Sequence, residues 1–270
     1  MNPAGPHANA SCQWQLFACM RIELSGKLAL VTGSTGGSAN GLAATGADVI
    51  VNGRRQQSVD TAIQDIKASV PGARVRGVAA DVSSAEGCSV LVKAVPAVDI
   101  LVNNAGVFEP KSFFDIPNED WLRLFQIKVM AGVRLSRAYM PAMLSRNCGR
   151  IVFISSESAL NIPNQGCGAG DCSRSCLVDR RNCRDRQFGF AWTDALDGVE
   201  ALLEKMAERL GKPVDEMAAV SSRNTVQHRS CSASPSVEEI ANMVVHTASK
   251  EASATNGTAL RVEGGVIQTI

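Results

Sequence analysis

The sequence predicts a single-domain α/β fold with a doubly wound (Rossmann-type) parallel sheet, and three observations lead to this prediction. Short apolar runs rich in valine and isoleucine alternate with longer segments of helical period. The runs are apolar at nearly every position, as in strands that helices cover on both faces. A glycine-rich turn at 32–37 directly follows the first run. We therefore expect parallel strands joined by right-handed helical crossovers.

The first half of the chain supplies five strands and the helices between them. Runs such as LALV and DILV are bounded by glycine, asparagine or charged residues, which indicate where each strand ends. The segments between the runs are long enough for the crossovers that parallel pairing requires. Strands are expected at 27–33, 48–54, 74–82, 98–106 and 149–156, and helices at 56–69, 84–95 and 118–146.

The second half of the chain has a weaker pattern. The segments 164–193 and 220–234 mix Cys, Arg, Asp and Gly without a sustained period, and are atypical of the fold. Between them, 197–211 predicts an amphipathic helix that ends at glycine. Ser236 is expected to cap a further helix, with Glu239 completing a capping box. The chain then closes with a last strand and a tail.

The two ends and the charge balance limit the function classes. Residues 1–19 lack a basic start and a long apolar run, so we expect a disordered extension rather than a signal peptide. Residues 20–270 are expected to form the domain, in the cytoplasm. A net charge of +1 gives no attraction to nucleic acid or to an anionic membrane, and no apolar run is long enough to span a bilayer. Neither is an expected partner.

Nine cysteines raise the question of a metal site or a disulfide framework. Four of them, Cys167, Cys172, Cys176 and Cys183, lie in one short polar segment. Their spacing differs from the paired CxxC arrangement of zinc sites, and no signal indicates an oxidising compartment. We predict no metal and treat these residues as loop cysteines without function.

The glycine-rich turn is a candidate phosphate site. Gly33 and Gly37 flank Ser34 and Thr35 between the first strand and a short helix. Backbone N–H groups and a helix N-terminus there suit a pyrophosphate, and a Cβ would block its approach. A third glycine would be expected at position 39, which is Ala39. A tight turn without a ligand would also use glycines, so this alternative stays open.

The end of the second strand indicates which dinucleotide would bind. Asn52 and Arg54 stand where an acidic residue would accept hydrogen bonds from the ribose of NAD. A guanidinium group instead suits the 2′-phosphate of NADP. The sequence therefore favours NADP over NAD, although solvated surface arginines would look the same.

Five motifs in the right order resemble the short-chain dehydrogenase/reductase family: TGSTGG, AADV (79–82), LVNNAG (101–106), IVFISS (151–156) and ALRVEGG (259–265). The resemblance covers about 20–160 and 234–267. It implies an NAD(P)(H)-dependent oxidoreductase that acts on a carbonyl or secondary alcohol and forms a homo-oligomer. It also implies roles for individual residues: Asp81 and Val82 at the adenine, Asn104, Ala105 and Gly106 along the cofactor, and Ser156 at the carbonyl of a small-molecule substrate.

The chain departs from the family where the chemistry is expected. A ketone that receives a hydride needs a proton donor, which the family supplies with a tyrosine whose pKa a nearby lysine lowers. In this chain the tyrosine position is Ala169 and the lysine position is Ser173, and Lys128 replaces an asparagine of the proton relay. The single tyrosine, Tyr139, falls inside the long helix and is expected to pack in the core.

Two more departures concern the framework. The helix after the phosphate turn is about one helical turn shorter than in the family, which should preserve the buried face. The strand expected after the tyrosine helix is unrecognisable in 177–193.

One hypothesis explains both atypical segments. Back-translating RSCSAS (229–234) with GC-rich codons and reading one frame over gives Leu-Leu-Gln-Arg-Phe, which resembles the family's sequence before its last helix. Compensated frameshifts in 164–193 and 220–234 would leave a catalytically inactive, dinucleotide-binding remnant. The resemblance predicts that the chain descends from an oxidoreductase. The absence of the Tyr and the Lys favours a remnant that does not turn over substrate. Nothing supports hydrolase chemistry at Ser156, because no histidine lies near it in the sequence.

Overall fold

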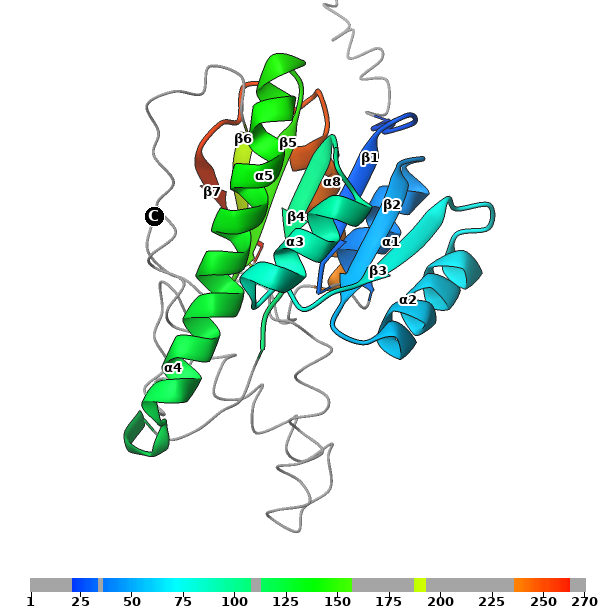
Figure 1. Ribbon diagram of the computed structural model, residues 1–270. Helices are drawn as coiled ribbons and strands as arrows, with labels where there is room; N and C mark the ends of the chain where they lie inside the picture. Colours follow the sequence, from blue (N-terminus) through cyan, green and yellow to red (C-terminus); the bar gives the residue numbers. More distant parts are fainter. Residues whose placement is uncertain (1–20, 34–35, 108–112, 157–186, 193–235, 263–270) are drawn as a thin grey trace, which may run out of the picture.

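The computed structural model describes residues 21–33, 36–107, 113–156, 187–192 and 236–262. Within these ranges the strands form one sheet of order β3-β2-β1-β4-β5-β6-β7, in which every neighbouring pair is parallel. Helices lie against both faces of the sheet (Figure 1). The predicted doubly wound, Rossmann-type α/β fold is therefore confirmed.

The strands coincide with the apolar runs, trimmed by a residue or more at their ends. The glycine and asparagine residues that close each run lie just outside the ladder or at its last position. The strands are β1 (Leu28–Thr32), β2 (Asp48–Gly53), β3 (Val75–Ala79), β4 (Ile100–Asn103), β5 (Arg150–Ser155), β6 (Gln187–Trp192) and β7 (Thr258–Leu260).

The helices of the first half also lie where the period predicts them. The long helix predicted at 118–146 is continuous but contains one π-helical turn, Gln126–Met130, between α4 and α5. A short 3₁₀ turn, Phe113–Asp115, precedes α4. The α-helices are α1 (Gly37–Ala44), α2 (Gln56–Ser69), α3 (Ala85–Ala94), α4 (Asn118–Phe125), α5 (Ala131–Ser145) and α8 (Val237–Ala248).

The continuous apolar character of the strands fills two cores, one on each face of the sheet. Alternate strand residues point to opposite faces. Val31 and Val49 pack with α1, α2 and α8, whereas Leu30, Ile50 and Leu101 pack with α3 and α5. Both faces of the central strands are buried, as expected for a parallel sheet.

One strand lies in a segment for which the sequence predicts none. β6 pairs in parallel with β5 and β7, inside the atypical range 164–193. Its residues, QFGFAW, alternate large aromatic with small or polar residues over a short length, which is a strand period. The charges and cysteines just before it hide this signal when a longer window is averaged. The prediction of no recognisable strand was wrong at this point.

The last helix begins as the sequence predicts. The Ser236 hydroxyl accepts the N–H of Glu239 (3.3 Å), and the Glu239 carboxylate accepts the N–H of Ser236 (2.7 Å). The capping box is therefore confirmed. The tail 1–19, the helix expected at 197–211 and the segment 220–234 lie outside the described residues.

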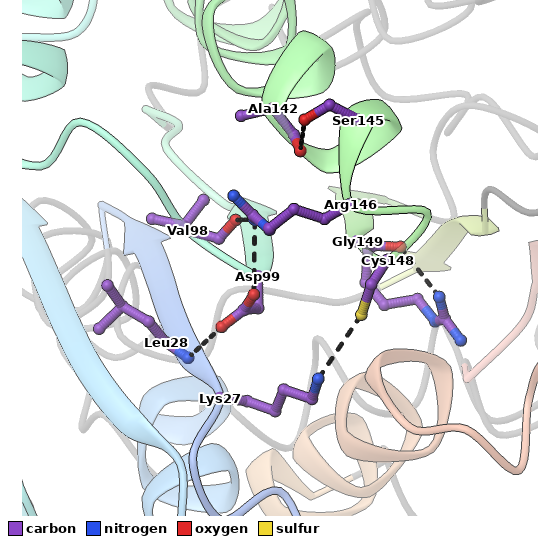
Figure 2. A network of polar contacts seen from close by, with 10 residues as sticks. Lys27, Leu28, Val98, Asp99, Ala142, Ser145, Arg146, Cys148 and Gly149 are labelled. Atoms are coloured by element: carbon purple, nitrogen blue, oxygen red, sulfur yellow. Dashed lines mark hydrogen bonds and ion pairs between the residues drawn. The ribbon is translucent and has the colours of Figure 1, made fainter.

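Polar contacts hold together the edge of the sheet at the amino ends of the strands (Figure 2). Asp99 accepts the backbone N–H of Leu28 (3.0 Å) and pairs with Arg146 (3.4 Å), which also donates to the carbonyl of Val98 (2.9 Å). Lys27 donates to the Cys148 Sγ (3.5 Å). We call this edge the amino edge; the network joins β1, β4 and the end of α5 there.

The described residues include no helix that is both long and apolar enough to cross a membrane. They also hold no cluster of three or more His, Cys, Asp or Glu side chains suited to a metal ion; the four loop cysteines lie outside the described ranges.

Candidate active site

The candidate site lies at the opposite edge, where the strands end. Because β1 lies between β2 and β4, the chain winds in opposite directions on either side of it, and ligands of such sheets bind at this point. The Thr32 hydroxyl accepts the N–H groups of Asn104 (3.0 Å) and Ala105 (3.1 Å) and donates to the carbonyl of Val102 (3.3 Å). We call the edge at the carboxyl ends of the strands the carboxyl edge. These hydrogen bonds hold the ends of β1 and β4 together there.

Gly33 makes the close approach between these two segments possible. Its φ of +61° lies in the left-handed region that favours glycine. A Cβ at Gly33 would lie 2.6 Å from the Cα of Ala105. The Asn104 side chain also donates to the Gly33 carbonyl (3.3 Å). The structure thus brings together Gly33, Asn104 and Ala105, three of the predicted site residues, whereas Ser34 and Thr35 lie outside the described residues.

Gly37 has a role that sequence reasoning missed. It is the first residue of α1, so the helix N-terminus points at the turn. A Cβ on Gly37 would overlap the Cγ1 of Val237, and a Cβ on Gly41 would lie 2.9 Å from the Cβ of Ala241. One face of α1 therefore packs closely on α8. The sequence signal is the glycine pair four residues apart, which places both on one helix face.

The ends of β2 and β3 carry the residues predicted to select the dinucleotide. Asn52 is buried, and its amide donates to the carbonyls of Val78 (3.1 Å) and Ala80 (3.0 Å), so it holds these two strand ends together. Arg54 follows as an exposed cation. Within the described ranges it has no ion-pair partner.

Asp81 and Val82 differ in exposure. The Asp81 carboxylate is exposed and accepts the N–H of Ser83 (3.0 Å). Val82 is buried in the core that faces α3 and α5. A ligand here would therefore meet the Asp81 side chain but only the backbone of Val82.

Lys128 and Gly106 form a contact that the sequence does not reveal. Lys128 belongs to the π-helical turn, and its Nζ and Cε lie against the Cα of Gly106, where a Cβ would be 2.6 Å from the Cε. Burial lowers the pKa of the Lys128 ammonium below its usual range, and no carboxylate offsets this shift. Among the described residues it has no hydrogen-bond or ion-pair partner. The only sequence signal is a cation inside the apolar run QIKVM.

Ser156 lies at the same edge. The parallel register pairs Asn103 of β4 with Phe153 of β5. Gly106 and Ser156 each follow their paired residue by three positions, so both lie just beyond the carboxyl ends of neighbouring strands. Ser156 is half-buried there.

Tyr139 packs in the core, as predicted, and does not reach this edge. It is 1% exposed, and its hydroxyl donates to the carbonyl of Val95 (2.8 Å), which precedes β4. Burial, with a smaller contribution from Cys88, raises the pKa of Tyr139 to about 12. Ala169 and Ser173, at the positions of the family's Tyr and Lys, lie outside the described residues. No tyrosine of the described chain stands at the carboxyl edge.

The fold and this edge define a Rossmann-type α/β protein, and comparison with known proteins gives its family. The short chain dehydrogenase family model matches residues 27–168. Uncharacterized oxidoreductase YvaG of Bacillus subtilis is 37% identical over 267 residues, covering 93% of this chain and 100% of that protein. Dehydrogenase/reductase SDR family member 4 of Bos taurus is 35% identical over 189 residues, covering 65% of this chain and 66% of that protein.

Solved structures agree. The L-sorbose reductase of Gluconobacter frateurii, complexed with NADPH and L-sorbose, has a TM-score of 0.80 at 26% identity and covers 93% of this chain and 100% of its own. A short chain dehydrogenase/reductase family protein has a TM-score of 0.73 at 28% identity and covers 92% of this chain and 100% of its own. The chain belongs to the short-chain dehydrogenase/reductase family of oxidoreductases.

Proposed function

We propose that the protein binds NADP at the carboxyl edge and reduces a carbonyl, or oxidises a secondary alcohol, of a small molecule. The observation that carries the proposal is the glycine-lined gap between β1 and β4, where Gly33 touches Ala105 and α1 begins at Gly37. Backbone N–H groups at such a helix start suit a pyrophosphate. The L-sorbose reductase that shares the fold was solved with NADPH bound.

The residues of this edge fit an extended dinucleotide. Gly33, Ser34, Thr35 and Gly37 would hold the phosphates, and Arg54 would pair with a 2′-phosphate because it is exposed and uncommitted. Asp81 and the backbone of Val82 would flank the adenine, while Asn104, Ala105 and Gly106 would line the nicotinamide half. Asn52 would not contact the dinucleotide; its side-chain hydrogen bonds fix the end of β2, which Arg54 follows.

The nicotinamide would supply or accept the hydride, and Ser156 would bind the carbonyl oxygen. A hydroxyl donates one hydrogen bond to a carbonyl oxygen, and that bond strengthens as negative charge develops there. The position of Ser156, just beyond β5 at the edge where Gly106 follows the neighbouring β4, supports this role.

A second candidate function is dinucleotide binding without turnover. This candidate is supported by the absence of Tyr and Lys at positions 169 and 173. The single tyrosine, Tyr139, is hydrogen-bonded to Val95 at the amino edge, away from the candidate site. The family-model match also ends at residue 168, directly before Ala169. The frameshift hypothesis makes the same prediction; the gene sequence would contradict it if no alternative frame encodes a YxxxK helix.

Two measurements separate these functions. We expect saturating NADPH to raise the melting temperature more than NADH does; no shift with either dinucleotide would contradict both candidates. Carbonyl reduction is then assayed across aldehydes and 1,2-diketones, beside a variant carrying Ala169→Tyr and Ser173→Lys. NADPH binding without reduction by the natural chain would select the second candidate. Turnover that survives Ser156→Ala would contradict the role of Ser156.

Two further expectations accompany the proposal. A homo-oligomer is supported by exposed apolar side chains around the start of the long helix, where Phe114 is 93% and Leu122 64% exposed. Analytical ultracentrifugation checks it, and a monomer at micromolar concentration would contradict it. The cytoplasmic location stays a prediction from sequence.

A further inference from the structure

Lys128 is a half-buried cation to which the fold gives no partner among the described residues. Its side chain is half-buried, and no carboxylate or carbonyl of the described chain accepts from its Nζ. Placing an ammonium in such surroundings without a partner costs free energy. An unpaired, half-buried ammonium at the edge of the sheet where ligands of such folds bind indicates that Lys128 has a functional role.

The position of Lys128 is set by the backbone rather than by a flexible loop. It belongs to the π-helical turn that interrupts the helix between α4 and α5. Such turns insert one extra residue and re-aim the side chains they carry. The neighbouring residues Ile127 and Val129 are 7% and 6% exposed, so both sides of Lys128 are anchored in the protein interior.

The Lys128 amine reaches the candidate nicotinamide region. Its Nζ and Cε lie against Gly106, and the absence of a side chain at Gly106 is what admits them. Ser156 directly follows the adjacent strand β5, whose Phe153 pairs with Asn103, the last residue of β4. One hydroxyl and one ammonium therefore belong to the same edge of the sheet, where the reacting carbonyl would lie.

We propose that Lys128 is the proton donor for carbonyl reduction in this chain; the proposal rests on the proposed function. The carbonyl carbon would gain a C–H bond by taking a hydride, with the electron pair of the C–H bond that breaks in the dihydronicotinamide, and the C=O π electrons would move to oxygen. That oxygen would take a proton from the Lys128 Nζ as its N–H bond breaks. The products are an alcohol, NADP⁺ and a neutral lysine, which regains a proton from water.

The chemistry of the group agrees with this role. A general acid is most effective when its pKa lies near the working pH, and burial moves the pKa of Lys128 in that direction. No charged group on a described neighbouring element opposes this shift. Tyr139 is excluded because its proton is held by Val95 at the other edge.

The first test measures the amine directly, without cofactor or substrate. Competitive acetylation across pH, read by peptide mass spectrometry, gives the titration of each lysine. We expect Lys128 to titrate below a free lysine side chain added as an internal standard, and NADPH to protect Lys128. Titration of Lys128 together with the standard, or no protection when NADPH binds, would overturn the proposal.

The second test compares variants in the carbonyl-reduction assay. Lys128→Met and Lys128→Arg should lower kcat by about 10²–10⁴-fold, since neither side chain releases a proton near neutral pH. Their NADPH-induced thermal shift should equal that of the natural chain, and Lys67→Met should change neither quantity. Added ethylammonium should partly restore Lys128→Ala, which a structural role would not explain.

The outcomes distinguish this inference from the proposed function. If NADPH gives no thermal shift, the proposed function fails and Lys128 loses its role with it. If NADPH binds but Lys128→Met keeps its rate within about threefold, only the role of Lys128 is overturned. A natural chain that binds NADPH and reduces nothing across the panel overturns it as well.

Discussion

The two edges of the sheet satisfy their polar groups in opposite ways. At the amino edge, the Asp99 carboxylate is shared between Leu28 and Arg146 (Figure 2). The Tyr139 hydroxyl donates to the Val95 carbonyl there. At the carboxyl edge, the buried amide of Asn103 and the Lys128 ammonium have no partner among the described residues. The carboxyl edge, which also has satisfied groups at Thr32 and Asn52, thus differs by leaving these two groups open where the proposed dinucleotide would bind. Substitutions at the amino edge should mainly lower the free energy of unfolding, and those at the carboxyl edge should mainly change the proposed NADPH binding.

The largest expected effect is at the amino edge. Tyr139→Ala removes a buried ring and its hydrogen bond, so we expect the free energy of unfolding to fall by about 3–5 kcal/mol. Urea unfolding measures it. Tyr139→Phe, which removes only the hydroxyl, should cost about 1–3 kcal/mol because the Val95 carbonyl stays buried. A matching loss from both variants would show that the ring contributes nothing.

A second effect concerns alkaline pH. The pKa of Tyr139 is raised to about 12 in the folded protein, against about 10 when unfolded. The folded state thus holds this proton more tightly; the associated stability is fully present below pH 10 and is lost as pH rises from 10 to 12. The loss should reach about 2–3 kcal/mol.

The chain suits this measurement because Tyr139 is its single tyrosine. Tyrosinate absorbance near 295 nm therefore reports one group, and should appear together with unfolding. Tyr139→Phe should lack the added loss above pH 10. Ionisation near pH 10 in a chain that stays folded would contradict the buried position.

Gly33→Ala tests the carboxyl edge. The left-handed φ should cost about 1–2 kcal/mol, and the added methyl would press on Ala105. We expect the NADPH-induced thermal shift to disappear. Gly26→Ala is the matched control, because Gly26 has a φ of +76° but nothing within 4 Å of the added Cβ. It should lose similar stability and keep its response to NADPH.

The smallest effect is a change of preference rather than of stability. Arg54→Asp should lower the ratio of NADPH to NADH affinity by about tenfold or more, as an exposed guanidinium is replaced by a carboxylate. Isothermal titration measures both affinities, and the melting temperature should stay within a degree or so. Lys67→Glu reverses a charge in the last turn of α2, away from Arg54, and should leave the ratio unchanged. An unaltered ratio in Arg54→Asp would remove Arg54 from the site.

Sequence pattern predicted the fold wherever a local rule applied. The helix Gln56–Ser69 was located to the residue, and Ser236 was recognised by its capping partner three positions later. Strand β6 was missed because its short aromatic alternation follows a charged, cysteine-rich segment. An alternation that spans only six residues is lost when the pattern is averaged over a longer window.

The candidate site was predictable only where one segment carries the whole signal. Gly33 and Arg54 follow strands directly, so their positions at the carboxyl edge could be inferred. The contact between Lys128 and Gly106 could not, because it depends on how a helix with a π turn lies across the end of β4. The partners of Gly37 and Gly41 are two hundred residues away and belong to a helix of ordinary sequence.

That last contact ties the first helix of the chain to its last described one. Because α1 carries two glycines and is only eight residues long, α8 supplies much of the apolar surface that covers it. The start of the fold is thus completed by residues synthesised near its end. A ribosome that lost the reading frame before residue 236 would release a chain with a bare α1. Under the frameshift hypothesis, selection for the proposed nucleotide binding would therefore also act to restore the frame before α8.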